Sequence, residues 1–348
     1  MFKKLFLLSF FTFFVFLLSN EYFNWIEYNQ TASIDFRLSK NIDKSLESIP
    51  KKTLTPIPST KNAPNIINEV QGITNSNSAI LQSNVIYIDI LPKVINSGEF
   101  FMVRIDGDIN QNTSVFFLDK IFPVFGNKLD GYSTFIGVPL NTAEGTYEIT
   151  LSKTPNNKTI FTNNNTVQIL KKDRGFDYIS LSNEILSSSF SDDSLKIDSE
   201  IRSEASRMFS VSQYWTGPFD IPCAGDITTM FGVGRSYNKQ PISSYHLGLD
   251  IGAKKYEKIF APASGVIKRV DDSPLRGVLV YLDHGAGVQS SFAHLNSTLV
   301  SAGDIVRRGD LIGLVGSSGA STGPHLHWEV SVWGVLTDPL SWTQSSLF

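Results

Sequence analysis

All five histidines of the 348-residue chain lie in its last third, and four of them fall in three short motifs. The motifs are His246-Leu-Gly-Leu-Asp250, Phe-Ala-His294-Leu and Gly-Pro-His325-Leu-His327-Trp. Imidazoles and a carboxylate at such spacings can hold a divalent metal ion and leave further imidazoles for proton transfer. The fold is therefore constrained to bring three separate segments of the chain together around one point.

The His-x-His pair predicts two imidazoles that face one groove. In a strand, residues i and i+2 point to the same face, so His325 and His327 would lie together while Leu326 points into the core. Two imidazoles beside a Gly-Pro turn are costly to bury without partners. A metal ion satisfies one of them, and a reacting group or water satisfies the other.

The His246 motif must bend if both of its polar ends share one metal ion. Four fully extended residues span about 13 Å, whereas zinc ligands lie roughly 2.0–2.2 Å from the ion. We expect Gly248 to permit the bend. With His246, Asp250 and one member of the His-x-His pair, the ion has three protein ligands and one open position, which is typical of a catalytic site. Nitrogen and oxygen ligands without a thiolate favour one Zn²⁺ per chain.

Proton transfer then falls to the histidines that do not bind the metal. The chain has no His-Glu-x-x-His helix, so the glutamate base of that class of metalloprotease is absent. An imidazole pKa of about 6.5 lies close to that of zinc-bound water, about 7. His294 and the other member of the His-x-His pair are the candidates for proton transfer and oxyanion stabilisation.

Two further residues have simpler interpretations. His284 lies in Asp283-His-Gly-Ala-Gly, a predicted hairpin turn, and we expect a structural role for it. Cys223 is the single cysteine, so the chain cannot form an internal disulfide, and we interpret it as a small packing residue.

The N-terminus predicts export. Two lysines and an apolar run from Leu5 to Leu18 indicate that residues 1–20 are a signal peptide or a signal anchor. The exit of this segment lacks a small-x-small cleavage site, so the sequence leaves open whether it is removed or kept as a membrane anchor. The absence of a cysteine after the run excludes a lipoprotein anchor.

The rest of the chain divides by composition into four segments. Residues 21–83 are Asn-, Ser-, Thr- and Pro-rich and predict a polar flexible tether. Short β-rich runs between turns over residues 84–172 predict an immunoglobulin-like β-sandwich. Residues 173–214 predict a helical connector, with apolar positions at helical spacing after Asp192: Ile197, Ile201, Ala205 and Met208. Strands and glycine turns return over residues 215–348 and predict a compact antiparallel β domain, so the fold class is mainly β.

Charge gives no support for a nucleic-acid partner. The net charge is −3, the isoelectric point is near 6.0, and the lysines and arginines are scattered. The sequence does not determine the oligomeric state.

From about Phe219 to Trp342 the sequence resembles the lysostaphin/LytM-type zinc metalloendopeptidases, which cut peptide bonds in peptidoglycan. Besides the histidine motifs, the resemblance includes Ala261-Pro-Ala-Ser-Gly-Val, Arg308-Gly-Asp-Leu-Ile-Gly and the glycine-rich run from Gly316 to Glu329. The segment before it resembles, more loosely, the immunoglobulin-like domain that precedes such peptidases in some envelope proteins.

The resemblance implies particular roles for the site residues. His246, Asp250 and His327 would bind zinc, and His294 and His325 would be catalytic. The substrate would be the peptide part of peptidoglycan, in cross-bridges or stem peptides, and the protein would act in the bacterial cell envelope, in the periplasm or at the cell surface.

Two other functions fit the sequence less well. Some members of the family have lost metal ligands and activate other wall hydrolases instead; the intact ligands and histidines argue against such a non-catalytic regulator here. A wall-binding adhesin would not explain the histidine arrangement. The sequence does not specify which bond is cut.

Overall fold

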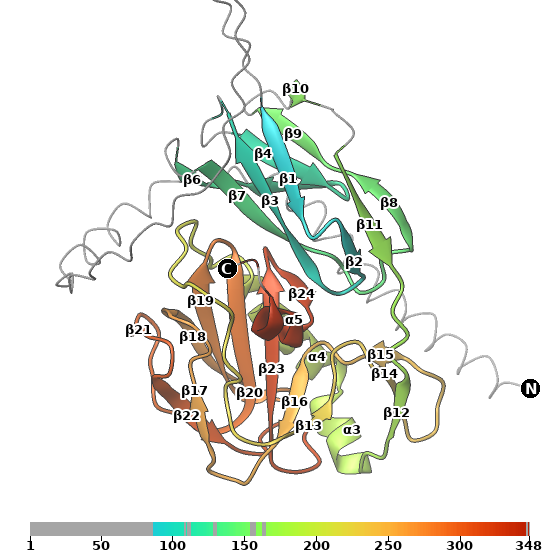
Figure 1. Cartoon of the computed structure of the whole chain (residues 1–348). Coiled ribbons are helices and arrows are strands. Elements are labelled where there is room, and N and C mark those ends of the chain that lie inside the picture. Colours follow the sequence, from blue (N-terminus) through green and yellow to red (C-terminus); the bar gives the residue numbers. More distant parts are fainter. Residues whose placement is uncertain are drawn as a thin grey trace, which may run out of the picture. The chain divides into compact units, whose positions relative to one another are not determined.

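The computed structural model describes residues 86–107, 109, 113–127, 131–153, 158–161, 165–345 and 347. The predicted signal segment (1–20) and tether (21–83) lie outside these residues. Within the described part, no helix has the length and apolar character needed to cross a membrane. Residues Asn84–Phe348 form one compact unit (Figure 1).

The predicted fold class is confirmed. Strands account for 47% and helices for 11% of the described residues, and most neighbouring strands are antiparallel. The exceptions are two parallel pairs, β2 (Val94–Asn96) with β11 (Thr166–Leu170) and β12 (Phe176–Ile179) with β14 (Gly234–Tyr237).

The first part of the described chain contains three small sheets. Fully buried side chains such as Phe101, Phe117 and Ile136 fill its core. Its assignment as an immunoglobulin-like sandwich stays a prediction. The sheets are, in order of pairing, β1 (Tyr87–Leu91), β3 (Phe100–Asp106), β7 (Gly131–Gly137) and β6 (Phe125–Asn127); β10 (Lys158–Phe161), β9 (Thr150–Lys153), β4 (Thr113–Phe117) and β5 (Lys120–Pro123); and β2 (Val94–Asn96), β11 (Thr166–Leu170) and β8 (Gly145–Glu148).

The connector begins with a strand that the sequence analysis did not predict. β12 (Phe176–Ile179) pairs in parallel with β14 (Gly234–Tyr237), which in turn pairs with β15 (Ser244–Tyr245). Phe176 and Tyr178 on β12 are both exposed. The strand therefore lacks the alternation between a buried and a solvated face from which strands are predicted, and the sequence analysis predicted only helical structure for this segment.

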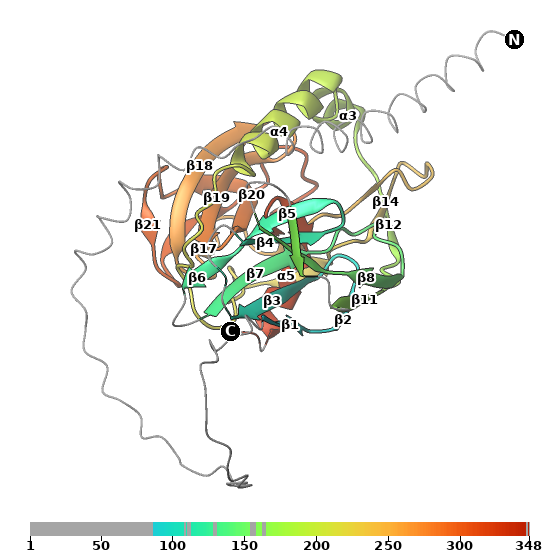
Figure 2. The ribbon, with the colours of Figure 1, turned by 90° about the horizontal axis from the view of Figure 1, so that it is seen from above.

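Helices α3 (Asn183–Ser189) and α4 (Asp192–Ala205) follow. The Ser191 hydroxyl accepts a hydrogen bond from the Ser194 amide, and the carboxylates of Asp192 and Asp193 favour the positive end of α4. Helix α4 lies against strand β18 (Gly265–Ser273; Figure 2). The predicted apolar face is only partly correct, because Ile197 is 41% exposed while Asp198 is buried.

The remaining strands form a ten-stranded sheet (Figure 1), which carries His294, His325 and His327, while His246 lies just before its strand β16 (Leu249–Gly252). Phe292, Leu326 and Trp328 are fully buried in its core, as expected for Leu326. The sheet order is β13 (Asp226–Thr229), β16 (Leu249–Gly252), β23 (His325–Val332), β20 (Val288–Thr298), β19 (Gly277–Gly285), β18 (Gly265–Ser273) and β21 (Ile305–Val306), with β22 (Leu311–Val315) paired to β20 and β17 (Lys258–Phe260), and β24 (Val335–Thr337) paired to β23.

Aromatic contacts join the first sheets to the last. Phe100 of β3 stacks on Trp342 of helix α5 (Pro339–Gln344), with ring centroids 3.8 Å apart. The indole N–H of Trp333 donates to the carbonyl of Phe135 at 3.1 Å. The two parts therefore share one continuous apolar core.

Candidate metal and proton-transfer site

The sheet register places Asp250 and His327 side by side. Strands β16 and β23 are antiparallel neighbours, and Asp250 pairs directly with His327 while Gly252 pairs with His325. His246 lies between β15 and β16, where its backbone N–H donates to the carbonyl of Val233 at 2.8 Å. His246 and Asp250, from one segment of the chain, thus meet His327 from a distant one.

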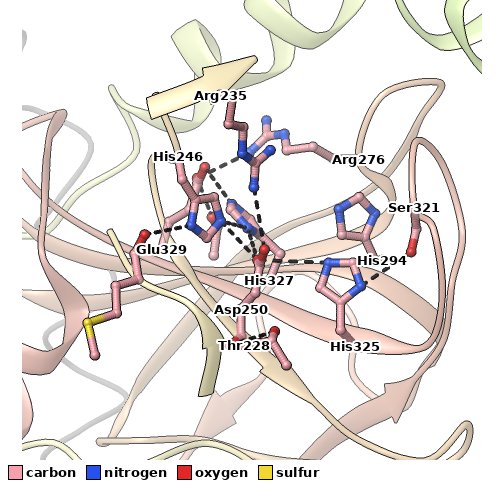
Figure 3. A network of polar contacts seen from close by, with 12 residues as sticks. Thr228, Arg235, His246, Asp250, Arg276, His294, Ser321, His325, His327 and Glu329 are labelled. Atoms are coloured by element: carbon pink, nitrogen blue, oxygen red, sulfur yellow. Dashed lines mark hydrogen bonds and ion pairs between the residues drawn. The ribbon is translucent and has the colours of Figure 1, made fainter. Parts of the chain in front are cut away.

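Three buried atoms converge at this point (Figure 3). Asp250 Oδ1 lies 2.9 Å from His246 Nε2 and 2.7 Å from His327 Nδ1, and the two nitrogens are 3.0 Å apart. Candidate ligand atoms of the three residues all lie within 4.8 Å of one another, close enough to hold a metal ion.

The outward-facing ring nitrogens determine what the inward-facing ones offer. His246 Nδ1 lies 2.9 Å from the Met230 carbonyl, which can only accept, so Nδ1 carries the proton and Nε2 presents a lone pair. His327 Nε2 lies 3.2 Å from the Glu329 carboxylate, so its Nδ1 presents a lone pair in the same way. When both rings are neutral, two imidazole lone pairs and a carboxylate oxygen therefore meet at this point, and a divalent cation is the natural partner for that donor set.

The ionisation of these groups fits the same interpretation. Burial lowers the pKa of His246, which keeps its ring neutral. Burial raises the pKa of Asp250, but the adjoining rings of His246 and His327 outweigh it and hold that pKa well below its usual value. Burial also raises the pKa of Glu329, but Arg202 and His327 outweigh it, so this carboxylate is ionised as well. Burial lowers the pKa of His327, but the Asp250 and Glu329 carboxylates outweigh it and raise that pKa, so a cation bound at His327 Nδ1 would take the place of a proton.

Gly248 has a role other than the one expected. The chain does bend between His246 and Asp250, but Gly248 is not in the left-handed region. A Cβ atom at this position would lie 2.7 Å from His327 Cε1 and 2.7 Å from the Trp328 carbonyl oxygen. The glycine is therefore required because β23 and the His327 ring pass directly over it.

His294 lies at an irregularity in β20. The strand pairs with β23 as far as Ala293 and with β22 from Leu295 onward, and His294 between them has a left-handed backbone with φ of +60°. Such bulges re-aim a side chain and are frequent beside active sites. Here the His294 ring comes within 4.7 Å of the His325 ring and 6.0 Å of the His327 ring, measured between centroids.

His294 and His325 share one hydrogen-bonding arrangement. His294 Nδ1 donates to the Ser318 carbonyl at 2.7 Å, and His325 Nδ1 donates to the Gly323 carbonyl at 2.9 Å. Nε2 of each neutral ring therefore presents a lone pair, and His325 Nε2 lies 3.8 Å from Asp250 Oδ1. Burial, followed by the neighbouring His325 and His327, lowers the pKa of His294 to about 3.

The other two residues singled out from the sequence lie apart from this cluster. His284 is fully buried; its Nδ1 donates to the Ser264 carbonyl at 3.0 Å, and its Nε2 lies 2.8 Å from the Ser290 hydroxyl. Burial lowers the pKa of His284 to about 4. Cys223 is buried, and burial raises the pKa of its thiol to about 12, so it is a packing residue as predicted.

Arg235 of β14 is a member of the site that the sequence analysis missed. Its Nη2 lies 3.4 Å from Asp250 Oδ2, the oxygen that does not face the two histidines. No motif marks this arginine, and only the pairing of β14 with β15 brings it beside Asp250.

Comparison with known proteins finds similarity over the segment that carries this site. Residues 244–339 match the model of Peptidase family M23. A solved structure of a putative M23 peptidase from Pseudomonas aeruginosa is 26% identical, has a TM-score of 0.51, and is matched over 66% of this chain and 87% of its own. The part matched to the family model contains His246, Asp250, His294, His325 and His327.

Two curated relatives match the same region. The DD-carboxypeptidase/endopeptidase Mpg of Neisseria meningitidis is 40% identical over 96 residues, which are 28% of this chain and 22% of that protein. The peptidoglycan DD-endopeptidase ShyC of Vibrio cholerae is 35% identical over 94 residues, 27% of this chain and 22% of that protein. The chain thus spans about a fifth of the length of these relatives.

Proposed function

We propose that this protein is a zinc-dependent endopeptidase that hydrolyses peptide bonds in peptidoglycan. The observation that carries the proposal is the convergence of His246 Nε2, Asp250 Oδ1 and His327 Nδ1, three buried acceptors within 2.7–3.0 Å of one another. When bound there, zinc would polarise the scissile carbonyl and lower the pKa of a water molecule.

The imidazoles beside the metal ligands would move the protons. His294 and His325 both point Nδ1 at a carbonyl, so each neutral ring offers Nε2 as a base. One accepts a proton from the attacking water, and in its protonated form it can donate to the oxyanion or to the departing amine. The low pKa of His294 makes its protonated form a strong acid, which favours return of the proton to the amine as the C–N bond breaks.

A peptide of peptidoglycan is the substrate that the surroundings support. A hollow lined by Gly252, Ala253 and Pro324, among others, adjoins His325, because Gly252 pairs with His325 across the strands. Two relatives matched over this region are named as a DD-carboxypeptidase/endopeptidase and as a peptidoglycan DD-endopeptidase. We place the protein in the bacterial cell envelope on this basis, with the N-terminal segment as its signal or anchor.

The test combines metal content with digestion of purified peptidoglycan. We expect about one zinc per chain and new peptide termini, detected by mass spectrometry, that disappear with a chelator. His294→Ala and His325→Ala should keep zinc yet lose roughly 10²–10⁴-fold in activity. Zinc-loaded protein that releases no peptide from any peptidoglycan would refute the proposal, and metal-free protein that activates a separate wall hydrolase would favour the regulator instead.

A further inference from the structure

Helix α4 turns a polar face into the protein. Asp198 and Arg202 are four residues apart and so lie on the same side of the helix. The Asp198 side chain is 9% exposed and that of Arg202 is 33% exposed. Neither residue belongs to the region that matches the peptidase family, residues 244–339.

Arg202 is connected to the metal ligand His327 through one residue. Its guanidinium donates two hydrogen bonds to Glu329, at 3.2 and 3.1 Å. Glu329 in turn accepts from His327 Nε2 at 3.2 Å and from the Ser291 hydroxyl at 2.8 Å. The carboxylate that orients the ligand ring is therefore itself held by the helix, in the two-point geometry that an arginine gives a carboxylate.

Asp198 is connected to His294 in a parallel way. Asp198 Oδ1 accepts from Arg276 Nε at 2.7 Å and from the Ser273 hydroxyl at 3.2 Å. The backbone carbonyl of Arg276 accepts the N–H of His294 at 2.9 Å, at the point where β20 is irregular. Arg276 also donates to Glu329 at 3.3 Å, so the two routes meet.

Stability alone does not account for this network. Its two arginines and two carboxylates balance in charge, but buried ion pairs are often no more stabilising than apolar residues of similar volume. A fixed orientation, in contrast, is something an apolar contact could not give to Glu329 or Arg276. Outer partners of this kind fix the ring orientation of metal-bound histidines.

We propose that Arg202 and Asp198 are positioning residues, through which helix α4 sets the orientation of His327 and the backbone position of His294. The inference rests on the proposed function and adds to it an element outside the peptidase-family match. Any displacement of α4 would loosen a metal ligand and a proton-transfer group at the same time.

Zinc affinity, measured by competition with a chromogenic chelator and without substrate, tests the Arg202 route independently of peptidase activity. Arg202→Gln and Glu329→Gln should each weaken zinc binding by roughly 10- to 100-fold, and Arg202→Lys, which keeps the charge but not the fork, should fall between. If Arg202 acts through Glu329, the double variant should bind zinc no more weakly than Glu329→Gln alone.

The matched control is Lys196→Gln, a cation on the same helix whose side chain is 75% exposed. It should retain the affinity of the parent protein. Parent-like affinity in a folded Arg202→Gln protein, or additive losses in the double variant, would overturn the proposal. Arg202→Gln leaves the Glu329 carboxylate without its arginine, which can prevent folding, whereas the double variant Arg202→Gln/Glu329→Gln removes that carboxylate as well. If Arg202→Gln does not fold, parent-like zinc affinity in Glu329→Gln or in the double variant would refute the proposal.

The Asp198 route has a different expected signature because His294 is not a ligand. Asp198→Asn should leave zinc affinity within about twofold of the parent and lower kcat about tenfold or more with little change in KM. An unchanged kcat would refute this route. A parent protein that binds zinc but cleaves no peptidoglycan would refute the proposed function, while the zinc measurements would still decide the Arg202 route.

Discussion

Replacing Gly248 with alanine should disable the metal site from a position that bears no ligand. The added Cβ would lie 2.7 Å from His327 Cε1, 2.8 Å from His327 Nε2 and 2.7 Å from the Trp328 carbonyl oxygen. Ordinary contact begins at 3.4 Å, so the ring and strand must move by about 0.7 Å to restore normal contacts. The carbonyl belongs to β23, inside the ten-stranded sheet, so we expect the ring to move more than the strand.

That displacement exceeds what a metal site tolerates. Ligand distances in functional sites lie within about 0.2 Å of their preferred values, so the Gly248→Ala protein should bind zinc roughly 10- to 100-fold more weakly. The measurement is chelator competition together with a thermal melt of the metal-free protein. Gly145→Ala is the control, because its Cβ would make only ordinary contact with Tyr147 at 3.6 Å. Parent-like zinc affinity in Gly248→Ala would show that the close approach to His327 does not restrain the ring.

Three further predictions follow from buried groups. Burial holds the folded-state pKa of His284 near 4, against about 6.5 in the unfolded chain. The unfolded state therefore gains a proton that the folded state cannot, and stability should fall by about 3 kcal/mol as the pH drops from 6.5 to 4. In denaturant unfolding across this pH range, the free energy of unfolding should fall less for His284→Gln than for the parent protein, and an equal fall in both would contradict the prediction. A chelator should lower the melting temperature, because zinc at about 100 times its Kd adds roughly 2.7 kcal/mol to the free energy of unfolding. His327→Ala should remove this effect of the chelator, and a parent protein whose melting temperature is the same with and without chelator would contradict the prediction. Cys223, whose thiol pKa is raised to about 12 by burial, should react with a thiol reagent only after unfolding, and rapid labelling of the native protein would contradict that assignment.

The sequence motifs identified the centre of the site because its chemistry is local. The i and i+2 spacing of His325 and His327 on β23 places both imidazoles on one face, and the structure has Asp250 and His246 beside them. The buried Leu326 and Trp328 follow from the same alternation. Such features depend on strand periodicity, which neighbouring residues along the chain are enough to specify.

The surroundings of the site were decided by contacts between distant segments. Arg235 and strand β12 take their places through long-range strand pairing, and Ile197 proved exposed while the polar Asp198 is buried on the same helix. A helical pattern ranks residues by hydrophobicity, and it cannot anticipate that Asp198 will meet Arg276, 78 positions further on.

The amino-acid sequence by itself thus determined a mainly β chain with a set of residues suited to a metal and to proton transfer. Only the tertiary structure decided how those residues are oriented: the left-handed backbone of His294, the passage of His327 over Gly248, and the links from α4 to Glu329 and Arg276. The physical reason is that side-chain type and spacing are properties of the local chain, whereas orientation is fixed by hydrogen bonds and packing that form only when remote segments meet.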